Sequence, residues 1–201
     1  MKSIRDIYKI GKGPSSSHTM GPERAAKLFL SEHPEADRIQ VILYGSLSKT
    51  GVGHGTDRVL REVLSSVDNK IIYAQEDPED MGHPNTMDFF AYQGETQTGH
   101  FRVESVGGGD IVILGRPADP NEEIYPENSF AEIADFCKWR YIHTLSEYVE
   151  MNEGPEIWDF LREVWAAMQR SISDGLSATG TLPGGLNVQR KAKYLYEQAL
   201  P

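Results

Sequence analysis

One stretch near the start of the chain decides its local fold, Gly13-Pro14-Ser15-Ser16-Ser17-His18-Thr19-Met20-Gly21-Pro22. Its glycines and prolines predict a tight loop rather than a core strand or a core helix. Pro22 suits the first position of a helix that runs through Phe29 and ends near Ser31 or Glu32, before His33-Pro34. The stretch therefore predicts a loop that leads directly into a helix N-terminus.

The start of that helix predicts an anion site. Backbone N–H groups and the positive end of the helix dipole meet there, which favours a small carboxylate or phosphate. Neutral hydroxyl donors and one imidazole lie in the same loop, contributed by Ser15, Ser16, Ser17, His18 and Thr19. A run of three serines is also typical of a flexible linker, and this stretch alone leaves that alternative open.

A second stretch has the same character, Tyr44-Gly45-Ser46-Leu47-Ser48-Lys49-Thr50-Gly51-Val52-Gly53-His54-Gly55-Thr56-Asp57. It follows a predicted buried strand over residues 38–44, and Thr56 or Asp57 is expected to cap the next helix. A strand, a glycine-rich turn and a helix would place His54 on a loop at the carboxyl end of the strand. We interpret His18 and His54 as two parts of one site, where a neutral histidine can accept a proton and Thr56 can face the same cavity.

Composition excludes several classes of protein. The 201 residues carry a formal net charge of -10, which disfavours binding to nucleic acid. No apolar run is long enough to span a membrane, and the N-terminus lacks a secretory signal, so we expect a cytoplasmic protein. Cys137 is the single cysteine, which excludes an internal disulfide and a metal site made only of cysteines from one chain.

The rest of the chain predicts an α+β fold in two parts. Residues 1–120 form a mixed α/β domain, with further strands at 70–74, 87–92, 101–106 and 111–114 and a plain turn or bulge at Gly107-Gly108-Gly109. After a linker near residues 116–123, residues 121–201 form the first helices of an all-α domain that is truncated. The predicted helices begin at the capping box of Ser129 and Glu132, near Thr144, at Pro155 with an end at Gly175, and after residue 190. The aromatic stripe of the third helix indicates a larger helical domain or a surface that needs a partner.

The two glycine-rich stretches together resemble the N-terminal part of the iron–sulfur-dependent bacterial L-serine dehydratases. The resemblance covers nearly the whole chain, which is expected to span less than half of the family's usual length. It implies that His54 and Thr56 abstract a proton and support that step, and that the loop from Ser15 to Thr19 lies at the active site. It also implies substrate-binding roles for His83 and Asn85 in His-Pro-Asn, and for Arg190 at the end of Leu-Pro-Gly-Gly-Leu-Asn-Val-Gln-Arg.

The resemblance carries expectations about cofactor and partners. Such enzymes convert L-serine to pyruvate and ammonia and use a 4Fe-4S cluster as a Lewis acid, without pyridoxal phosphate. The cluster cysteines would lie outside this chain, so we expect the chain alone to be inactive, and either a homodimer or association with a cysteine-bearing chain. A stand-alone module that binds serine or another hydroxy acid, one half of a split enzyme, and a truncated piece remain open alternatives.

Overall fold

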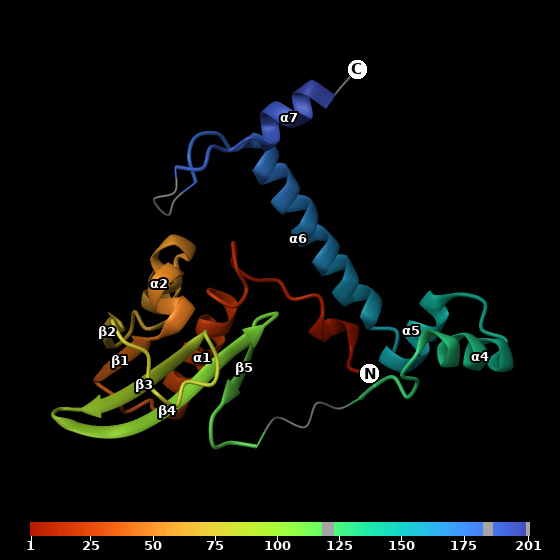
Figure 1. Cartoon of the computed structure of the whole chain (residues 1–201). Coiled ribbons are helices and arrows are strands. Elements are labelled where there is room, and N and C mark those ends of the chain that lie inside the picture. The colour runs from red at the N-terminus through yellow and green to blue at the C-terminus, as the bar shows by residue number, and fades with distance from the viewer. Residues whose placement is uncertain (118–122, 183–186, 200–201) are drawn as a thin grey trace. The chain divides into compact units, whose positions relative to one another are not determined.

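The chain folds into two compact units. The computed structural model describes residues 1–117, 123–182 and 187–199 (Figure 1). The first unit, here called the sheet unit, comprises Gly11–Ala118 and Gly180–Gln189; the second, the helical unit, comprises Met1–Ile10, Asp119–Thr179 and Arg190–Pro201. The predicted α+β class is confirmed, whereas the predicted domain boundary at residues 120/121 lies outside the described residues and stays a prediction.

The sheet unit is built on one mixed sheet of five strands in the order β2-β1-β3-β4-β5 (Figure 1). β1 and β2 are parallel, and the other neighbours are antiparallel. The strands are β1 (Arg38–Leu43), β2 (Asp68–Tyr73), β3 (Thr86–Gln93), β4 (Thr96–Gly107) and β5 (Asp110–Ile113). All four strands predicted after residue 69 are present, together with β1, because each carries β-branched or aromatic residues between turn residues.

Helices cover one face of this sheet and enclose the core. α1 (Met20–Glu32) contacts β4, β5 and α3 (Thr56–Val63), and it buries Phe29 completely. Facing side chains come from paired positions of neighbouring strands, such as Val41, Phe89 and Phe101. The ring centroids of Phe29 lie 5.4 Å from Phe89 and 4.7 Å from Phe101, so aromatic packing fixes α1 on the sheet. α1 also ends at Glu32, as predicted.

The glycine-rich stretch after β1 is helical, which corrects the predicted loop. α2 (Gly45–His54) and α3 are separated only by Gly55, whose φ of 76° both ends α2 and starts α3. Gly55 therefore replaces Thr56 and Asp57 as the N-cap of α3. Three glycines in ten residues argue against a helix, but Leu47 is fully buried and the Gly45 amide donates to Asp77 Oδ1 at 2.7 Å. Tertiary contacts thus outweigh the low local propensity.

The three consecutive glycines form a turn, as predicted. Gly107, Gly108 and Gly109 all have positive φ, at 104°, 60° and 80°, and they connect β4 to β5 beside a shift in strand register. Such angles are strained for residues with a side chain, so the glycines are needed for the turn.

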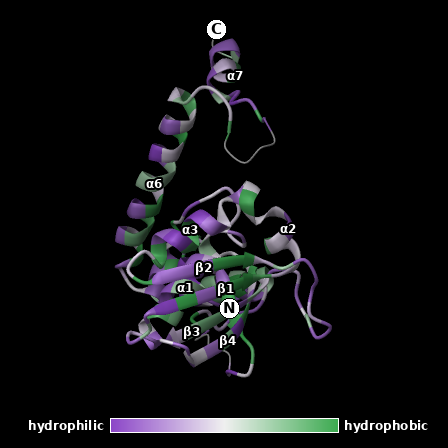
Figure 2. Cartoon of the chain, turned by 90° about the vertical axis from the view of Figure 1, so that its left-hand side faces the viewer, coloured by the Kyte–Doolittle hydropathy of each residue, from purple (hydrophilic) through white to green (hydrophobic). Residues whose placement is uncertain are grey.

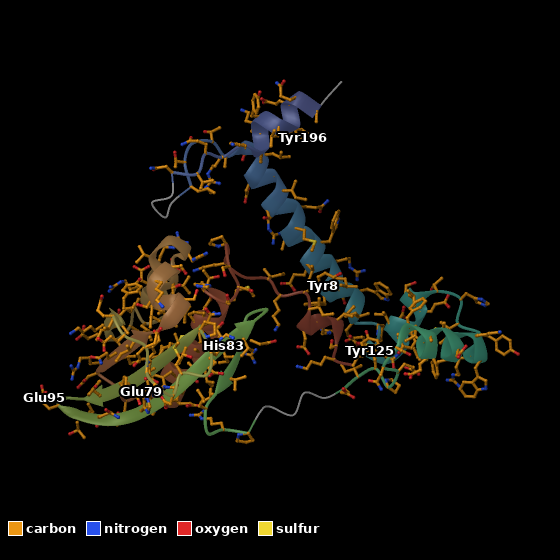
Figure 3. All side chains as sticks on the ribbon, viewed as in Figure 1. Tyr8, Glu79, His83, Glu95, Tyr125 and Tyr196 are labelled. Atoms are coloured by element: carbon orange, nitrogen blue, oxygen red, sulfur yellow. The ribbon has the colours of Figure 1, made fainter. Side chains whose placement is uncertain are left out.

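The helical unit begins with the N-terminal segment and continues through four helices. These elements are η1 (Ile4–Asp6), α4 (Phe130–Arg140), α5 (Leu145–Glu153), α6 (Ile157–Ser177) and α7 (Ala192–Ala199). The predicted N-cap is confirmed, because Ser129 Oγ accepts from the Glu132 amide at 3.3 Å, whereas the Glu132 carboxylate accepts from the Asn128 amide at 2.7 Å, one residue before the position that a capping box uses. Glu153 joins the N-terminal segment to α5, because its carboxylate accepts hydrogen bonds from Ser3 Oγ and the Ile4 amide. It also accepts a hydrogen bond from the hydroxyl of Tyr125, which is labelled in Figure 3.

The long helix α6 differs from its prediction in two ways. It continues through Gly175 to Ser177, so Gly175 does not cap its end. Ile157 and Val164 are buried, but Trp165, Met168 and Ile172 are exposed, and Figure 2 shows hydrophobic and hydrophilic positions interleaved along the helix. The predicted apolar stripe is therefore only partly buried among the described residues. None of the helices in those residues combines the length and the apolar character needed to cross a membrane.

Candidate functional site

The serine-rich loop is an ordered turn that leads into α1. The Ser15 carbonyl accepts from the amides of His18 and Thr19 at 3.1 and 2.9 Å, and the Ser16 carbonyl accepts from the Gly21 amide at 2.9 Å. Thr19 is fully buried, and the single hydrogen of its hydroxyl is shared between the Ser15 carbonyl at 2.7 Å and the Lys12 carbonyl. These bonds argue against the linker alternative, because a flexible linker lacks fixed internal partners. α1 begins at Met20, two residues earlier than predicted, with Thr19 as its N-cap.

His18 lies at the centre of a group of hydroxyls. Its Nδ1 is 3.1 Å from both Ser15 Oγ and Ser17 Oγ. Its Nε2 is 3.1 Å from both Ser46 Oγ and Thr50 Oγ1. The first pair comes from its own loop and the second from α2, so the imidazole ring joins the two glycine-rich stretches.

His54 lies against His18, as the paired motifs predict. The two ring centroids are 4.4 Å apart and the ring planes are inclined by 34°. His54 is the last residue of α2, rather than part of a loop, and its Nδ1 is 2.9 Å from the Thr50 carbonyl oxygen. His54 is partly exposed, whereas His18 is 8% exposed, so His54 is the more accessible of the two rings.

Thr56 supports His18 through the backbone. It is fully buried, and its hydroxyl donates to the His18 carbonyl at 2.7 Å. His18 precedes the N-cap Thr19, so its carbonyl lies outside the hydrogen-bond ladder of α1, in which the Thr19 carbonyl accepts the first bond, from the Glu23 amide. Thr56 therefore supplies a donor to a carbonyl that the helix itself does not satisfy, and within the described contacts its side chain is a positioning group.

The loop between β2 and β3 closes the start of α2. The Pro84 carbonyl accepts from the Ser46 amide at 2.7 Å, and the Asn85 amide donates to His83 Nδ1 at 3.1 Å. Figure 3 labels His83 on this loop. Gly45 has a φ of 52°, and a Cβ added to it would lie 2.4 Å from the Pro84 oxygen. Glycine at this position allows the loop that carries His83 and Asn85 to approach the N-terminal end of α2, the end opposite to His54.

Burial sets the charge state of His18. Desolvation is the main cause that holds its pKa below the ordinary histidine value, and the neighbouring His54 ring lowers the pKa further by repulsion between positive charges. A hydrogen bond with Ser46 acts in the opposite direction but is the smallest contribution. His18 is therefore neutral near pH 7, and the pair disfavours a state in which both rings are protonated.

The predicted site residues fall into two groups. The sheet unit contains nine of them, namely Ser15, Ser16, Ser17, His18, Thr19, His54, Thr56, His83 and Asn85. Direct contacts join His18 with Ser15, Ser17, His54 and Thr56. Arg190 is exposed and is assigned to the helical unit, so its role as a carboxylate ligand stays a prediction. Residues 183–186 of its predicted motif lie outside the described residues. The roles assigned to all ten residues remain predictions.

Sequence reasoning missed Ser46 and Thr50. Both contact His18 Nε2, and Thr50 also contacts His54 through its carbonyl. The spacing of Ser46, Thr50 and His54 is four residues, which places all three on one face of a helix. This four-residue spacing is visible in the sequence, but it indicates a shared face only if the glycine-rich stretch is helical.

The residues of the described parts do not fit an iron–sulfur cluster. The chain has one cysteine, Cys137, whereas such clusters are normally held by several thiolates. In residues 1–117, 123–182 and 187–199, no group of three or more histidine, cysteine, aspartate or glutamate side chains is arranged to hold a metal ion. Between β2 and β3 lies an acidic segment, residues 76–80, in which Asp77 contacts the Gly45 amide and Asp80 contacts Arg102.

Comparison with known proteins shows which proteins this chain resembles. Residues 3–69 match the model of the serine dehydratase beta chain. The chain is 32% identical to L-serine dehydratase 1 of Escherichia coli and 29% identical to the L-serine dehydratase of Haemophilus influenzae, over 97% and 98% of its length, respectively. It is also 30% identical to the L-serine dehydratase of Streptomyces coelicolor, over 94% of its length.

The chain spans 53–54% of the length of these relatives, slightly more than the share expected from the motifs. The matched region contains η1, the serine-rich loop, α1, β1, α2 and α3, and hence both histidines and Thr56. The predicted resemblance to the bacterial L-serine dehydratases is therefore confirmed, and residues 3–69 are the part of the chain that is similar to the serine dehydratase beta chain.

Proposed function

We propose that this chain contributes the proton-accepting group and the substrate-carboxylate pocket to an L-serine dehydratase, which converts L-serine to pyruvate and ammonia. The observation that carries the proposal is the contact between the His18 and His54 rings, with 4.4 Å between their centroids. Both histidines lie in the region that matches the serine dehydratase beta chain. Their contact brings the two motifs, 36 positions apart along the chain, into one site.

The proposed reaction is an elimination. His54 accepts the Cα proton of L-serine, the electrons of that C–H bond form a C=C bond, and the Cβ–O bond breaks with loss of the hydroxyl group. The product, aminoacrylate, rearranges to an imine that water hydrolyses to pyruvate and ammonia. His54 suits the first step because one ring nitrogen contacts the Thr50 carbonyl and the other is available to take the proton.

Substrate binding is assigned to the loop before α1. The loop from Ser15 to Thr19 precedes the N-terminus of α1, and the positive end of a helix favours a carboxylate. His83 and Asn85 would complete this pocket, and Arg190 would add a guanidinium that can bind a carboxylate with two hydrogen bonds. These roles are part of the proposal.

Departure of the hydroxyl group needs assistance that this chain does not provide. Since the chain has a single cysteine, we propose that any 4Fe-4S cluster of the full enzyme takes its cysteines from outside this sequence. A second copy of the chain, or a cysteine-bearing chain, is the proposed partner. The expectations of a cytoplasmic location and of no pyridoxal phosphate likewise stay predictions.

One observation favours a second function, the binding of serine or another small hydroxy acid without turnover. Nine of the ten predicted site residues lie in the sheet unit alone. A site that is confined to one compact unit can bind a ligand without the helical unit. Under this alternative the histidine pair would recognise the ligand rather than accept a proton from it.

The experiment that tests the proposal measures activity and cofactor content in one sample. The chain would be reconstituted with iron and sulfide under anaerobic conditions, mixed with L-serine and assayed for pyruvate while its visible absorbance is recorded. We expect no cluster absorbance and no pyruvate from this chain alone, and pyruvate after addition of a chain with the remaining half of an L-serine dehydratase. The His54→Ala variant should abolish that complemented activity. A His54→Ala sample that retains full activity would refute the assignment of the base, and L-serine binding without complementation would favour the alternative.

A further inference from the structure

Thr50 touches both histidines with two different atoms. Its hydroxyl oxygen lies 3.1 Å from His18 Nε2, and its carbonyl oxygen lies 2.9 Å from His54 Nδ1. No motif reasoning assigned a role to this residue. Because a neutral imidazole carries its single proton on one of two nitrogens, the partners of these nitrogens decide which one is protonated.

The carbonyl contact determines the tautomer of His54. A carbonyl oxygen only accepts hydrogen bonds, so His54 Nδ1 must donate in this contact. In the neutral ring the free lone pair then resides on Nε2. Since helix α2 fixes the Thr50 carbonyl, this arrangement does not depend on the side chain of Thr50.

The tautomer of His18 follows from the number of hydrogens on the Thr50 hydroxyl. Thr50 Oγ1 carries one hydrogen, and it donates this hydrogen to the Ser46 carbonyl at 2.8 Å. Its contact with His18 Nε2 is consequently a hydrogen bond in which the ring nitrogen donates. Ser46 Oγ, at 3.1 Å, lies on the same ring nitrogen and can share the donated hydrogen.

The opposite side of the His18 ring is compatible with this assignment. When Nε2 carries the proton, Nδ1 of the neutral ring has a lone pair. Ser15 Oγ and Ser17 Oγ are both 3.1 Å from Nδ1 and can donate to it. Both ring nitrogens therefore have a partner of the right kind in this one tautomer, with two hydroxyls sharing the lone pair of Nδ1 and two sharing the hydrogen of Nε2.

We infer that Thr50 is a positioning residue that holds the two histidines in complementary tautomers, His18 with its proton on Nε2 and His54 with its proton on Nδ1. The consequence for chemistry, which rests on the proposed function, is that His54 Nε2 is the atom that accepts the proton. His18 then serves as a neutral, oriented ring rather than as a competing base.

The test measures the 15N NMR chemical shifts of the ring nitrogens in the full chain. The measurement is made at about pH 8, above the ordinary histidine pKa of about 6.5. Protonated and unprotonated nitrogens have well-separated 15N shifts, and His18→Gln and His54→Gln variants assign the signals among the six histidines. We expect Nε2–H for His18 and Nδ1–H for His54. Any other tautomer for either ring in the unmodified chain overturns the inference.

Two substitutions at Thr50 and one nearby control separate its hydroxyl from the helix. Thr50→Val should lower the Nε2–H to Nδ1–H ratio of His18 about fivefold, the equivalent of one hydrogen bond of about 1 kcal/mol. The same variant should leave His54 as Nδ1–H, because the backbone carbonyl remains, and Thr50→Ser should restore the ratio of His18. Ser48→Ala removes a hydroxyl of the same helix that donates to the Ala74 carbonyl at 2.6 Å without touching a histidine, and it should change neither ring.

The outcomes distinguish this inference from the proposed function. An unchanged His18 ratio in Thr50→Val, or an equal change in Ser48→Ala, would overturn the role of Thr50. If the tautomers are as expected but L-serine shifts no histidine signal and yields no pyruvate on complementation, the proposed function fails while the inference about Thr50 stands.

Discussion

Replacement of Gly45 by alanine tests how the site is assembled. Gly45 has a φ of 52°, and a Cβ would lie 2.4 Å from the Pro84 oxygen and 3.1 Å from its carbonyl carbon. The left-handed conformation costs a residue with a side chain about 1–2 kcal/mol. Overpacking against backbone adds about 1–3 kcal/mol, because the atoms in the way cannot rotate aside. We therefore expect Gly45→Ala to lower the free energy of unfolding of the sheet unit by about 2–5 kcal/mol.

Gly94→Ala is the matched control for the backbone contribution. Gly94 has a φ of 58°, but a Cβ there would meet nothing within 4 Å. Its substitution should cost only about 1–2 kcal/mol. The difference between the two variants isolates the contact between α2 and the His83-Pro84-Asn85 loop.

The assay must report on the sheet unit. All three tryptophans, Trp139, Trp158 and Trp165, lie in the helical unit, so tryptophan fluorescence does not follow the sheet unit directly. Urea unfolding monitored by the methyl NMR signals of Val41 and Met87, both fully buried in the sheet, is suitable. Equal losses of stability in Gly45→Ala and Gly94→Ala would refute the close approach of the loop to α2.

Three further predictions concern single contacts. Thr56→Val should destabilise the sheet unit by about 1–3 kcal/mol in the same urea assay, because the His18 carbonyl loses its donor, and Thr56→Ser should retain most of the stability. Burial raises the pKa of Asp88, but hydrogen bonds from Arg102, Tyr44 and His100 outweigh burial and hold the pKa below its ordinary value. The ionised Asp88 therefore stabilises the folded state fully above the unfolded pKa of about 3.9, and this stabilisation is lost as the pH falls through the lower folded pKa. The urea midpoint of Asp88→Asn should consequently depend less on pH between about 5 and 2 than the midpoint of the unmodified chain. Glu153→Gln should weaken the attachment of the N-terminal segment by about 1–3 kcal/mol, seen as earlier unfolding by tryptophan fluorescence with the methyl signals of the sheet unit unchanged.

The parts of the fold that are set by neighbouring residues could be predicted from the sequence. β1 has apolar residues at Ile39, Val41 and Leu43, and alternate side chains of a strand share one face. The helix start at Ser129 and Glu132 needs contacts over only three or four residues, so its pattern is sufficient. These elements were found because their stabilising contacts are local.

α2 could not be predicted because its stability comes from distant contacts. Asp77 binds the Gly45 amide across 32 positions of the chain, and Gly51 packs against Thr56, where a Cβ would lie 3.2 Å from the hydroxyl oxygen. Local propensity opposes a helix with three glycines. The wrong prediction of a loop also affected the predicted site, because Ser46, Thr50 and His54 share one face only in a helix.

The pairing of the two histidines was predicted, but the way they are held was not. Two glycine-rich motifs with one histidine each indicated a shared site, and the rings of His18 and His54 are in contact. The role of Thr56 depends on a distant segment, because its hydroxyl donates to the carbonyl of His18, 38 positions away along the chain. Such a relation appears only when the two segments are side by side.

Binding of L-serine to this chain is the most direct test of the central claim. L-serine would be titrated into 15N-labelled protein while the ring signals of His18 and His54 are recorded, with D-serine as the matched control. The account predicts saturable shifts of both rings with L-serine, weaker shifts with D-serine, and loss of the response in Ser15→Ala/Ser17→Ala. Absence of any shift at either ring, or an identical response to both enantiomers, would contradict the claim that this pair of histidines lies at a serine site.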